Sequence, residues 1–405
     1  MLVGELDLPE LDYLDPELRG ERFHATMRDL GERHWLAQGP YGVFVLDREA
    51  GEQLLRSRSA TFPGLTIAEV FDISDGPLHE EIVRNIITLN GDDHRRLRAL
   101  VNPAFTPRAA ARYRPAMRGF LEELWAPVAE AGGACEFVGA IAKAYPALTI
   151  ATVMGAPLSD APRLHDWSAW IQRQFDPPVL MEHRATIEDR VASFYAWAGE
   201  LIAARRETPG DDLISTLIAA EQDGDRLSDV ECMNLVLNVL VGGVDTTQAQ
   251  LSHAVRLLAE HPDQWAALRA DPSLAGAAVE EALRFEPITP FTARICLEDV
   301  VIRDVTFPAG TVAMVSAWNG NRDPKVGEHP DRFDITAERS TNRVLTFGAG
   351  IHYCLGANLA RAELQEALGF LAERVSAVEL TGPPEFEPAT GIYGIERLPV
   401  RLTPA

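Results

Sequence analysis

The sequence predicts a mainly α-helical protein with small β-sheets. Long stretches of the chain repeat apolar residues at a spacing of three and four, which is typical of amphipathic helices. Hairpin patterns are short, and the clearest one lies near the start, at residues 35–45. Hydrophobic residues make up 46% of the 405 residues, and no linker-like run interrupts them. We therefore expect one domain over residues 1–405 rather than a string of modules.

Composition and charge narrow the possible partners and location. A formal net charge of −23 disfavours nucleic acid or an anionic membrane as a partner. The first residues lack a basic region followed by an apolar one, and no run of about 18 apolar residues occurs. We therefore expect a soluble, cytoplasmic protein. The cysteines are too far apart for a zinc site, an iron–sulfur site or a disulfide framework; they are Cys135, Cys232, Cys296 and Cys354.

The first hundred residues predict a hairpin, a helix, a loop and a second helix. The hairpin at 35–45 turns at Gly39-Pro40, and a short helix follows at 48–56. Residues 61–89 contain several turn sequences and scattered apolar residues, so we expect a long, partly irregular excursion, which in compact domains is usually functional or disordered. Asp92 can then cap a helix.

This second helix carries a basic face. His94 and Arg98 lie on the same face because they are four residues apart. A run of charged residues is usually a solvated helix face, so the pattern alone leaves open whether these two side chains bind a ligand. The sequence Asn102-Pro103 ends the helix, because proline disfavours a helical residue before it.

Two helical regions occupy the middle of the chain. Residues 108–205 predict a series of amphipathic helices without chemistry-bearing motifs, most simply a scaffold. A capping box at Ser228 and Glu231 then begins a helix that we expect to run to Glu260, roughly 48 Å at ~1.5 Å per residue.

The centre of this long helix is locally a poor helix. It reads Gly242-Gly243-Val244-Asp245-Thr246-Thr247. Each glycine costs about 1 kcal/mol relative to alanine, and a buried acid costs more unless it is paired. One explanation is structural, a helix crossing in which threonine bonds back to the carbonyl four residues earlier. The other is functional, a place where a ligand approaches the backbone.

The highest concentration of chemistry-bearing residues lies between Phe347 and Gly356, which read Phe-Gly-Ala-Gly-Ile-His-Tyr-Cys-Leu-Gly. Cys354 lies at the start of a long amphipathic helix at 355–375, whose unpaired amides and dipole favour a thiolate. The glycines permit positive φ and the close approach of something flat. A lone cysteine is most often a small buried hydrophobe, but the pattern Phe-x-x-Gly-x-His-x-Cys-x-Gly is much more specific.

This stretch closely resembles the haem-ligand loop of the cytochrome P-450 family. Three further motifs resemble that family in the same order along the chain: His94-x-x-x-Arg98, Gly242-Gly243-Val244-Asp245-Thr246 and Glu281-x-x-Arg284. The resemblance extends over essentially the whole chain. It implies the cytochrome P-450 fold, with haem b held between the long central helix and the cysteine-ligand loop.

The resemblance also implies which residues hold the cofactor. Cys354 would be the axial ligand, a thiolate that favours O–O cleavage. Phe347, Gly356 and Gly243 would border the haem. The haem propionates would be bound by His94, Arg98, Arg294 and His352. Because the family most often has arginine in place of His352, propionate binding there is expected to be weaker or pH-dependent.

Two further groups of residues take roles from the resemblance. Asp245 and Thr246 would deliver protons during oxygen activation. Glu281 and Arg284 would form a structural pair, completed by Arg332, that braces the cysteine loop. Residues 287–293 are expected to line the substrate pocket, and the turn at 392–395 should bring a final hairpin close to it.

The implied activity is monooxygenation of a hydrophobic small molecule, with one oxygen atom inserted and the other released as water. Because the chain has no flavin or iron–sulfur segment, electrons should come from a ferredoxin and a ferredoxin reductase. Two alternatives stay open. A peroxide-driven peroxygenase usually lacks the acid–threonine pair present here as Asp245 and Thr246. A non-catalytic haem sensor would need an output domain, and nothing resembling one is seen in the sequence.

Overall fold

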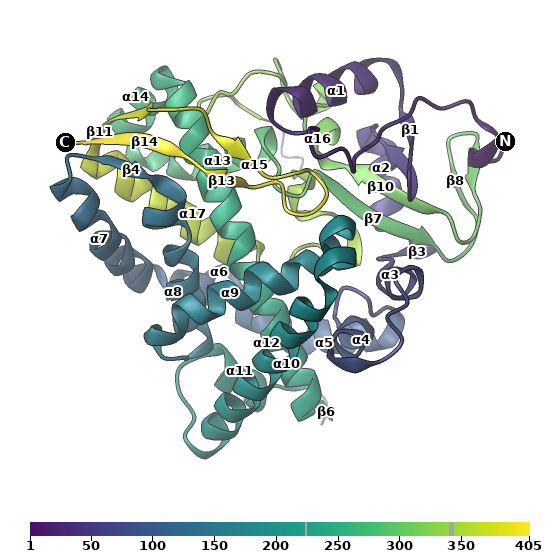
Figure 1. Ribbon diagram of the computed structural model, residues 1–405, viewed down its shortest axis with the longest axis horizontal. Coiled ribbons are helices and arrows are strands. Elements are labelled where there is room, and N and C mark those ends of the chain that lie inside the picture. Colours follow the sequence, from purple (N-terminus) through teal and green to yellow (C-terminus); the bar gives the residue numbers. More distant parts are fainter. Residues whose placement is uncertain (223–224, 340–343) are drawn as a thin grey trace.

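The computed structural model describes residues 1–222, 225–339 and 344–405, and it is mainly helical with small sheets. Helices fill the left and lower parts of Figure 1, and the largest sheet lies at the upper right. The α-helices are α1 Gly20–Arg33, α2 Arg48–Arg56, α3 Gly64–Val70, α4 Gly76–Arg84, α5 Gly91–Val101, α6 Pro107–Ala111, α7 Arg114–Glu130, α8 Ala144–Met154, α9 Ala161–Gln172, α10 Pro177–Glu207, α11 Leu213–Ala219, α12 Asp229–Gly243, α13 Asp245–Glu260, α14 Pro262–Ala270, α15 Ala275–Phe285, α16 Ala317–Gly320 and α17 Ala357–Arg374. The predicted fold class is confirmed.

The strands form one five-stranded sheet and several smaller ones. The large sheet has the order β1-β2-β10-β7-β3, in which only β10 and β2 are parallel. Its strands are β1 Leu36–Gly39, β2 Gly42–Val45, β3 Ala60–Thr61, β7 Phe291–Cys296 and β10 Val312–Ser316. A second sheet has the order β11-β14-β4 and joins Val375–Leu380, Pro399–Pro404 and Ala134–Glu136. Two-stranded ladders join β5 Glu221–Gln222 with β6 Asp225–Arg226, β8 Val300–Ile302 with β9 Val305–Phe307, and β12 Glu385–Phe386 with β13 Ile395–Arg397.

The predicted hairpin and the short helix after it are confirmed. β1 and β2 pair around the turn that Gly39-Pro40 begins, and α2 follows with the predicted bounds. Phe44 and Val45 are fully buried, and Asp47 caps α2 by accepting a hydrogen bond from the N–H of Ala50. The long helix predicted at 355–375 is also present, as α17, with its ends shifted by one or two residues.

The partly irregular excursion predicted at 61–89 contains two helices that the sequence reasoning did not identify, α3 and α4, with irregular segments between and after them. Leu78 and Ile82 are four residues apart and both buried, so α4 has a narrow apolar face. This face is too short to stand out among the turn sequences around it. The N-cap of α5 is Asn90 rather than Asp92, which lies within the first turn, where its charge still favours the helix dipole.

The long central helix is interrupted. Its predicted capping box is present at Ser228 and Glu231, but α12 ends at Gly243 and α13 begins at Asp245. Val244 lies between them at φ −95° and ψ −68°. The hydroxyl of Thr246 donates to the carbonyl oxygen of Gly242 at 2.6 Å, which is the back-bonding that weakens a helix locally. The prediction of one continuous helix to Glu260 is therefore wrong, and α10, kinked at His183, is the longest described helix.

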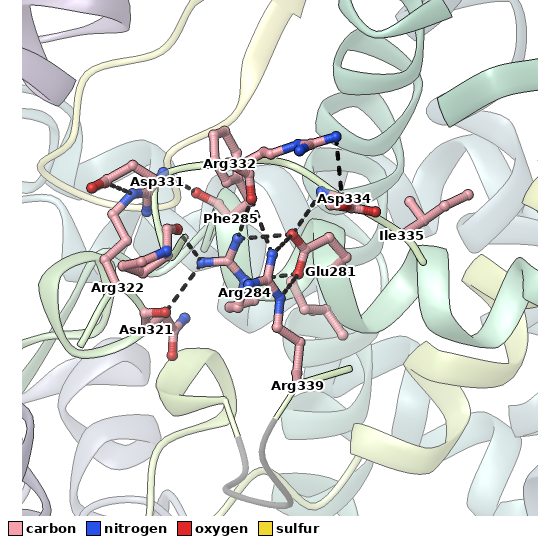
Figure 2. A network of polar contacts seen from close by, with 12 residues as sticks. Glu281, Arg284, Phe285, Asn321, Arg322, Asp331, Arg332, Asp334, Ile335 and Arg339 are labelled. Atoms are coloured by element: carbon pink, nitrogen blue, oxygen red, sulfur yellow. Dashed lines mark hydrogen bonds and ion pairs between the residues drawn. The ribbon is translucent and has the colours of Figure 1, made fainter. Parts of the chain in front are cut away.

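A buried ion network joins α15 to the segment after it (Figure 2). Glu281 and Arg284 form two hydrogen bonds of 2.7 and 2.8 Å and are almost fully buried. The third member is Arg339, whose guanidinium donates to both carboxylate oxygens of Glu281, at 2.6 and 3.1 Å. The prediction that Arg332 completes the pair is wrong, because its exposed side chain reaches Asp334 instead, at 3.7 Å. Only the carbonyl oxygen of Arg332 joins the network.

The network reaches the segment that leads to Cys354. Arg284 donates to the carbonyl oxygen of Asn321, at 3.3 Å. The side chain of Asn321 accepts from the N–H of Leu345 at 2.7 Å and donates to the hydroxyl of Thr346 at 3.0 Å. Thr346 in turn donates to the carbonyl oxygen of Leu283 on α15, at 2.6 Å. The residues just before Phe347 are therefore held to α15 by buried hydrogen bonds.

Replacement of Arg339 should destabilise the protein far more than replacement of Arg332. Arg339→Leu removes two charge-assisted bonds to a buried carboxylate, and we expect the free energy of unfolding to fall by about 1–3 kcal/mol. Arg332→Leu removes an exposed ion pair and should cost less than about 1 kcal/mol. Urea unfolding of both variants measures the difference, and an equal loss in the two would contradict the observed pairing.

Candidate active site

The loop around Cys354 is closed by its own backbone. The N–H of Cys354 donates to the carbonyl oxygen of Phe347 at 3.0 Å. Gly348 and Gly350 have φ values of 67° and 75°, in the left-handed region that favours glycine. A Cβ at Gly350 would also collide with the carbonyl oxygen of Leu55. Both glycines are therefore needed for this loop shape.

Cys354 is placed to act as a thiolate. Desolvation raises the pKa of its thiol, while the N–H groups of Gly356 and Ala357 and the charges of Arg98 and Arg361 lower it. The two N–H groups belong to the N-cap and first residue of α17, where helices stabilise negative charge. The predicted coupling between the cysteine and the helix start is therefore present, although α17 begins at Ala357 rather than at Leu355.

Glycines leave one side of the loop open. No heavy atom lies within 4 Å of the position that a Cβ would take at Gly348 or Gly356, and the same holds for Gly242 on α12. The ring of Phe347 lies beside the loop, 4.6 Å from the guanidinium carbon of Arg361 and 6.2 Å from the ring of Tyr353. Bare backbone next to a potential thiolate is what close approach of a flat cofactor requires.

Two histidines and two arginines come together beside this loop: His94, His352, Arg98 and Arg294. The rings of His94 and His352 are 4.5 Å apart, and Arg98 donates to the carbonyl oxygens of Tyr353 and Ile351. The charges of Arg294, His94 and Arg98 add to burial in lowering the pKa of His352 to about 3. Within residues 1–222, 225–339 and 344–405, no ion-pair partner is found for His94, His352, Arg98 or Arg294.

The charges of Arg98 and Arg294, without a counter-ion among the described residues, indicate an anionic ligand. Arg294 is 3% exposed and donates only to the carbonyl oxygen of Ala293 among the described contacts, and burial lowers its pKa to about 10. A buried charge is normally paired. The chemistry of the four side chains fits a ligand with two carboxylates, and haem b has two propionates. The site residues predicted for the cofactor thus fit it, with the thiol on one side and the cations at the edge.

The two central glycines face different surroundings. A Cβ at Gly242 would meet open space, whereas a Cβ at Gly243 would come within 2.5 Å of Cδ1 of Ile150 on α8. Gly243, which we predicted to border the haem, thus lets α12 approach α8 closely. Gly242 has the geometry expected for the residue that borders the cofactor.

Asp245 lies in a cluster of titratable groups that come from four other segments. Burial raises the pKa of its carboxyl, and the charges of His165, Arg173 and Lys143 partly offset this. Burial, together with the nearby Asp245, raises the pKa of Glu387 to about 8. His165 is in turn 2.8 Å from the side-chain oxygen of Gln248, one helical turn after Val244. The cluster can hold and exchange protons near neutral pH.

Glu387 belongs to the final hairpin, in the segment between β12 and β13 that lies against α13. The N–H of Glu387 donates to the carbonyl oxygen of Gly394 at 3.1 Å, and Gly394 packs on Ala249 of α13. Sequence reasoning placed the turn at 392–395 near the pocket but missed this acid. No local motif marks Glu387, since its role depends on where the hairpin between β12 and β13 meets α13.

The two threonines after Asp245 have different environments. The hydroxyl of Thr246 is half-buried and donates to the carbonyl of Gly242, next to the open side of the site. Thr247 is 2% exposed and lies against the carboxyl of Glu363 on α17, which also contacts Thr149. Burial raises the pKa of Glu363 well above its usual value. The sequence reasoning also did not identify Glu363, because a glutamate in an amphipathic helix is expected to lie on the surface.

A thiol beneath an open, glycine-lined space, with cations at its edge and a broken helix opposite, defines the site class of a haem-thiolate oxygenase. The family model for cytochrome P450 matches residues 16–391. The chain therefore belongs to the cytochrome P450 family. Its cofactor is haem b, and it is a monooxygenase that acts on a small-molecule substrate with redox partners.

Named relatives agree with this assignment. The chain is 34% identical over 401 residues to luteothin monooxygenase from Streptomyces thioluteus, covering 98% of this chain and 96% of the relative. It is 35% identical over 348 residues to erythromycin C-12 hydroxylase from Saccharopolyspora erythraea, covering 85% and 84%. The crystal structure of CalO2 superimposes with a TM-score of 0.89 at 29% identity, covering 98% of this chain and 100% of that structure. None of the helices in the described part of the chain is long and apolar enough to span a membrane.

Proposed function

We propose that monooxygenation takes place between Cys354 and the helix break at Val244, on a hydrophobic organic molecule. The observation that carries this proposal is the group of two arginines and two histidines beside the open loop of Cys354, in which Arg98 and Arg294 have no ion-pair partner among the described residues. Its relatives are named for oxidation of organic molecules such as erythromycin and cyclomarin C, which supports a substrate of that general class.

Cys354 would ligate the haem iron, and the residues around it would offset part of the cost of burying its thiolate. When bound, haem b supplies the reductive activation of dioxygen. The N–H groups of Gly356 and Ala357 and the charge of Arg98 stabilise the thiolate form of Cys354. Arg98 also donates to the carbonyl of Tyr353, so the same side chain fixes the loop and balances the charge of its sulfur.

Asp245 and Thr246 would deliver the protons. Burial raises the pKa of Asp245, and Glu387, whose pKa is raised to about 8, lies close enough to supply it with protons. Because the hydroxyl of Thr246 donates to Gly242, its oxygen remains free to accept a hydrogen bond on the open side of the helix. The hydroxyl is thus oriented for transfer rather than for helix stability.

Electrons would come from a ferredoxin and its reductase. Arg95 is exposed and lies three residues before Arg98, on the face of α5 that meets the Cys354 loop. Arg96, in contrast, pairs with Glu231, which closes the capping box of α12. Arg95 is therefore the better candidate for contact with an acidic partner on a chain of net charge −23.

We also propose a cytoplasmic location and one catalytic domain over residues 1–405. All four cysteines are free thiols, which suits a reducing compartment. The pairing of β14 with β4 joins the end of the chain to residues 134–136 and supports a single unit. A peroxide-driven reaction is the second candidate, since Asp245 and Thr246 do not by themselves exclude it, and the coupling experiment below separates the two.

Cys354→Ala should abolish the absorption of the reduced carbon monoxide complex that is diagnostic of thiolate ligation. The replacement removes the only proposed iron ligand without adding volume. The control variants Cys135→Ala, Cys232→Ala and Cys296→Ala should keep the absorption, since these thiols lie elsewhere in the fold. Survival of the thiolate spectrum in Cys354→Ala would disprove the assignment of the ligand.

Loss of Thr246 should uncouple the reaction. We expect Thr246→Ala to consume reductant with a ferredoxin system but to divert much of it to hydrogen peroxide. Asp245→Asn should slow oxygen consumption by about 10²–10⁴-fold, the usual effect of removing a general acid–base group. Thr247→Val serves as the control, because it should couple normally while losing about 1–3 kcal/mol of stability beside Glu363.

These rates are measured as product, reductant and peroxide in the same assay. Peroxide leakage from Thr247→Val instead of Thr246→Ala would show that the wrong hydroxyl was assigned. Tight coupling in both would make the polar cluster structural. Turnover of the unmodified protein with peroxide alone at the full rate, and no gain from ferredoxin, would favour the peroxide-driven alternative.

Arg95→Glu should slow ferredoxin-supported reduction several-fold and leave peroxide-supported turnover unchanged. The matched control is Arg33→Glu on α1, an exposed arginine that also pairs with a nearby aspartate. Both variants change the net charge equally, so a difference between them reports the location of the charge. The effect should shrink at high ionic strength. Equal slowing by the two variants would argue against docking on α5.

A further inference from the structure

A buried polar cluster lies between α3, α4 and the short turn after α9, outside the residues assigned to the cofactor and the proton route. Its polar members are Glu81 at 0% exposure, Gln174 at 3%, Asn85 at 5% and Thr88 at 8%. They surround a cavity of about 10 Å³ that is otherwise apolar, lined by Phe62, Ile67, Ile82 and Phe175. Figure 1 shows α3 and α4 next to α5 at the lower right.

Three polar atoms of this cluster lack a partner. Asn85 donates to one carboxylate oxygen of Glu81 at 2.5 Å. The other oxygen of Glu81 and both polar atoms of the Gln174 amide make no hydrogen bond of good geometry in the described part of the chain, although the amide lies close enough to the carboxyl of Glu81 to lower its pKa. A buried polar atom without a partner typically costs about 1–3 kcal/mol. Two neighbouring side chains with such atoms indicate a site that receives a polar group.

The site lacks positive charge. Glu81 forms no ion pair with any described residue, and burial raises its pKa to about 7, so part of the population is ionised at neutral pH. The nearby Arg84 is engaged by Glu80 on the exposed face of α4. A buried carboxylate is stable only when a cation or several hydrogen-bond donors compensate it. The group that would complete this site therefore carries both a positive charge and several hydrogen-bond donors.

The cluster borders the active site on two sides. Gln174 directly follows Arg173, whose charge acts on Asp245. Thr88 lies two residues before Asn90, whose side-chain oxygen is 3.2 Å from Nε2 of His352. One turn before Gly242, Asn238 of α12 accepts a hydrogen bond from the N–H of Ile86, in the segment between α4 and α5. The cavity lining itself contains none of the residues assigned to the cofactor or the proton route, so a ligand group at Glu81 reaches the oxygen-activating site only through a molecule that passes between these neighbouring segments.

We propose that Glu81 and Gln174 bind a protonated amino group of the substrate and so select organic amines. The inference rests on the proposed monooxygenase site. A cavity of about 10 Å³ holds one water-sized group, which matches an ammonium head with the apolar body directed elsewhere. An ammonium group offers three donors and a positive charge, whereas a hydroxyl group offers one donor and leaves the carboxylate uncompensated. The net charge of −23 also attracts organic cations.

Matched pairs of linear alkylamines and alkanols, from octyl to tetradecyl, test this proposal on the haem-bound protein. Displacement of water from the iron gives a type I spectral shift, and nitrogen binding to the iron gives a type II shift. We expect amines to give type I shifts, because the ammonium group is held at Glu81 and the alkyl chain points to the iron. Their Kd should be lower than that of the alkanol of equal length by at least about tenfold.

Glu81→Gln should raise the Kd of the amines by at least about tenfold and change that of the alkanols by less than about twofold. Glu80→Gln is the matched control, since it removes the same charge from the exposed face of α4. Gln174→Leu should weaken amine binding to a smaller extent, and it serves as the test variant if Glu81→Gln does not fold. A rise in Tm on addition of amine, present in the unmodified protein and absent in Glu81→Gln, gives a second readout.

Four results would overturn the proposal: type II shifts with amines, equal affinity for amines and alkanols, equal weakening of both ligands by Glu81→Gln, or no binding of any amine. The last three would indicate a cluster that holds only water. The thiolate spectrum and the alkanol response report the haem site independently. A normal thiolate spectrum with failed amine selection would therefore refute the amine site alone, whereas loss of that spectrum would refute the proposed function.

Discussion

The structure depends on keeping a negative charge on a sulfur atom inside the protein. Burial of Cys354 opposes the thiolate and raises the pKa of its thiol, and the first N–H groups of α17 together with Arg98 and Arg361 offset part of that cost. These groups stabilise the thiolate only when their positions are fixed. Arg98 is fixed by the carbonyls of residues 351 and 353, and the start of the loop is tied to α15 through Asn321 and Thr346. The buried ions of α15 thus act on the chemistry indirectly, through the position of the loop.

The break between α12 and α13 combines a structural and a functional role. A continuous helix would use the carbonyl of Gly242 in its own ladder, with the N–H of Thr246 as donor. At the break, the hydroxyl of Thr246 bonds to that carbonyl instead, and the glycine side stays open. The structural and functional explanations of this segment are therefore not alternatives. The back-bonding that weakens the helix also orients the hydroxyl that the proton route would use.

Sequence reasoning succeeded where the signal is local and failed where tertiary structure decides. The hairpin, α2, the capping box at Ser228 and the start of α17 near Cys354 follow from residues within one or two turns. The choice between Arg332 and Arg339 could not be made, because both lie in one irregular segment and the backbone path determines which side chain reaches Glu281. No sequence motif marks Glu387 or Glu81, since the pKa of each carboxyl is raised by burial against a segment that is distant in the chain.

Uncompensated charge is separated across the site. Beside His94 and His352, the charges of Arg98 and Arg294 lack anionic partners in the described part of the chain, although the chain as a whole has a net charge of −23. The other side collects acids, with Asp245 and Glu387 in one group and Glu81 in another. A cofactor with two carboxylates on one edge is bound favourably in only one orientation by such an arrangement. The acidic residues on the other side can accept protons and cationic groups. The same distribution of charge thus orients the cofactor and determines which charged groups can bind near it.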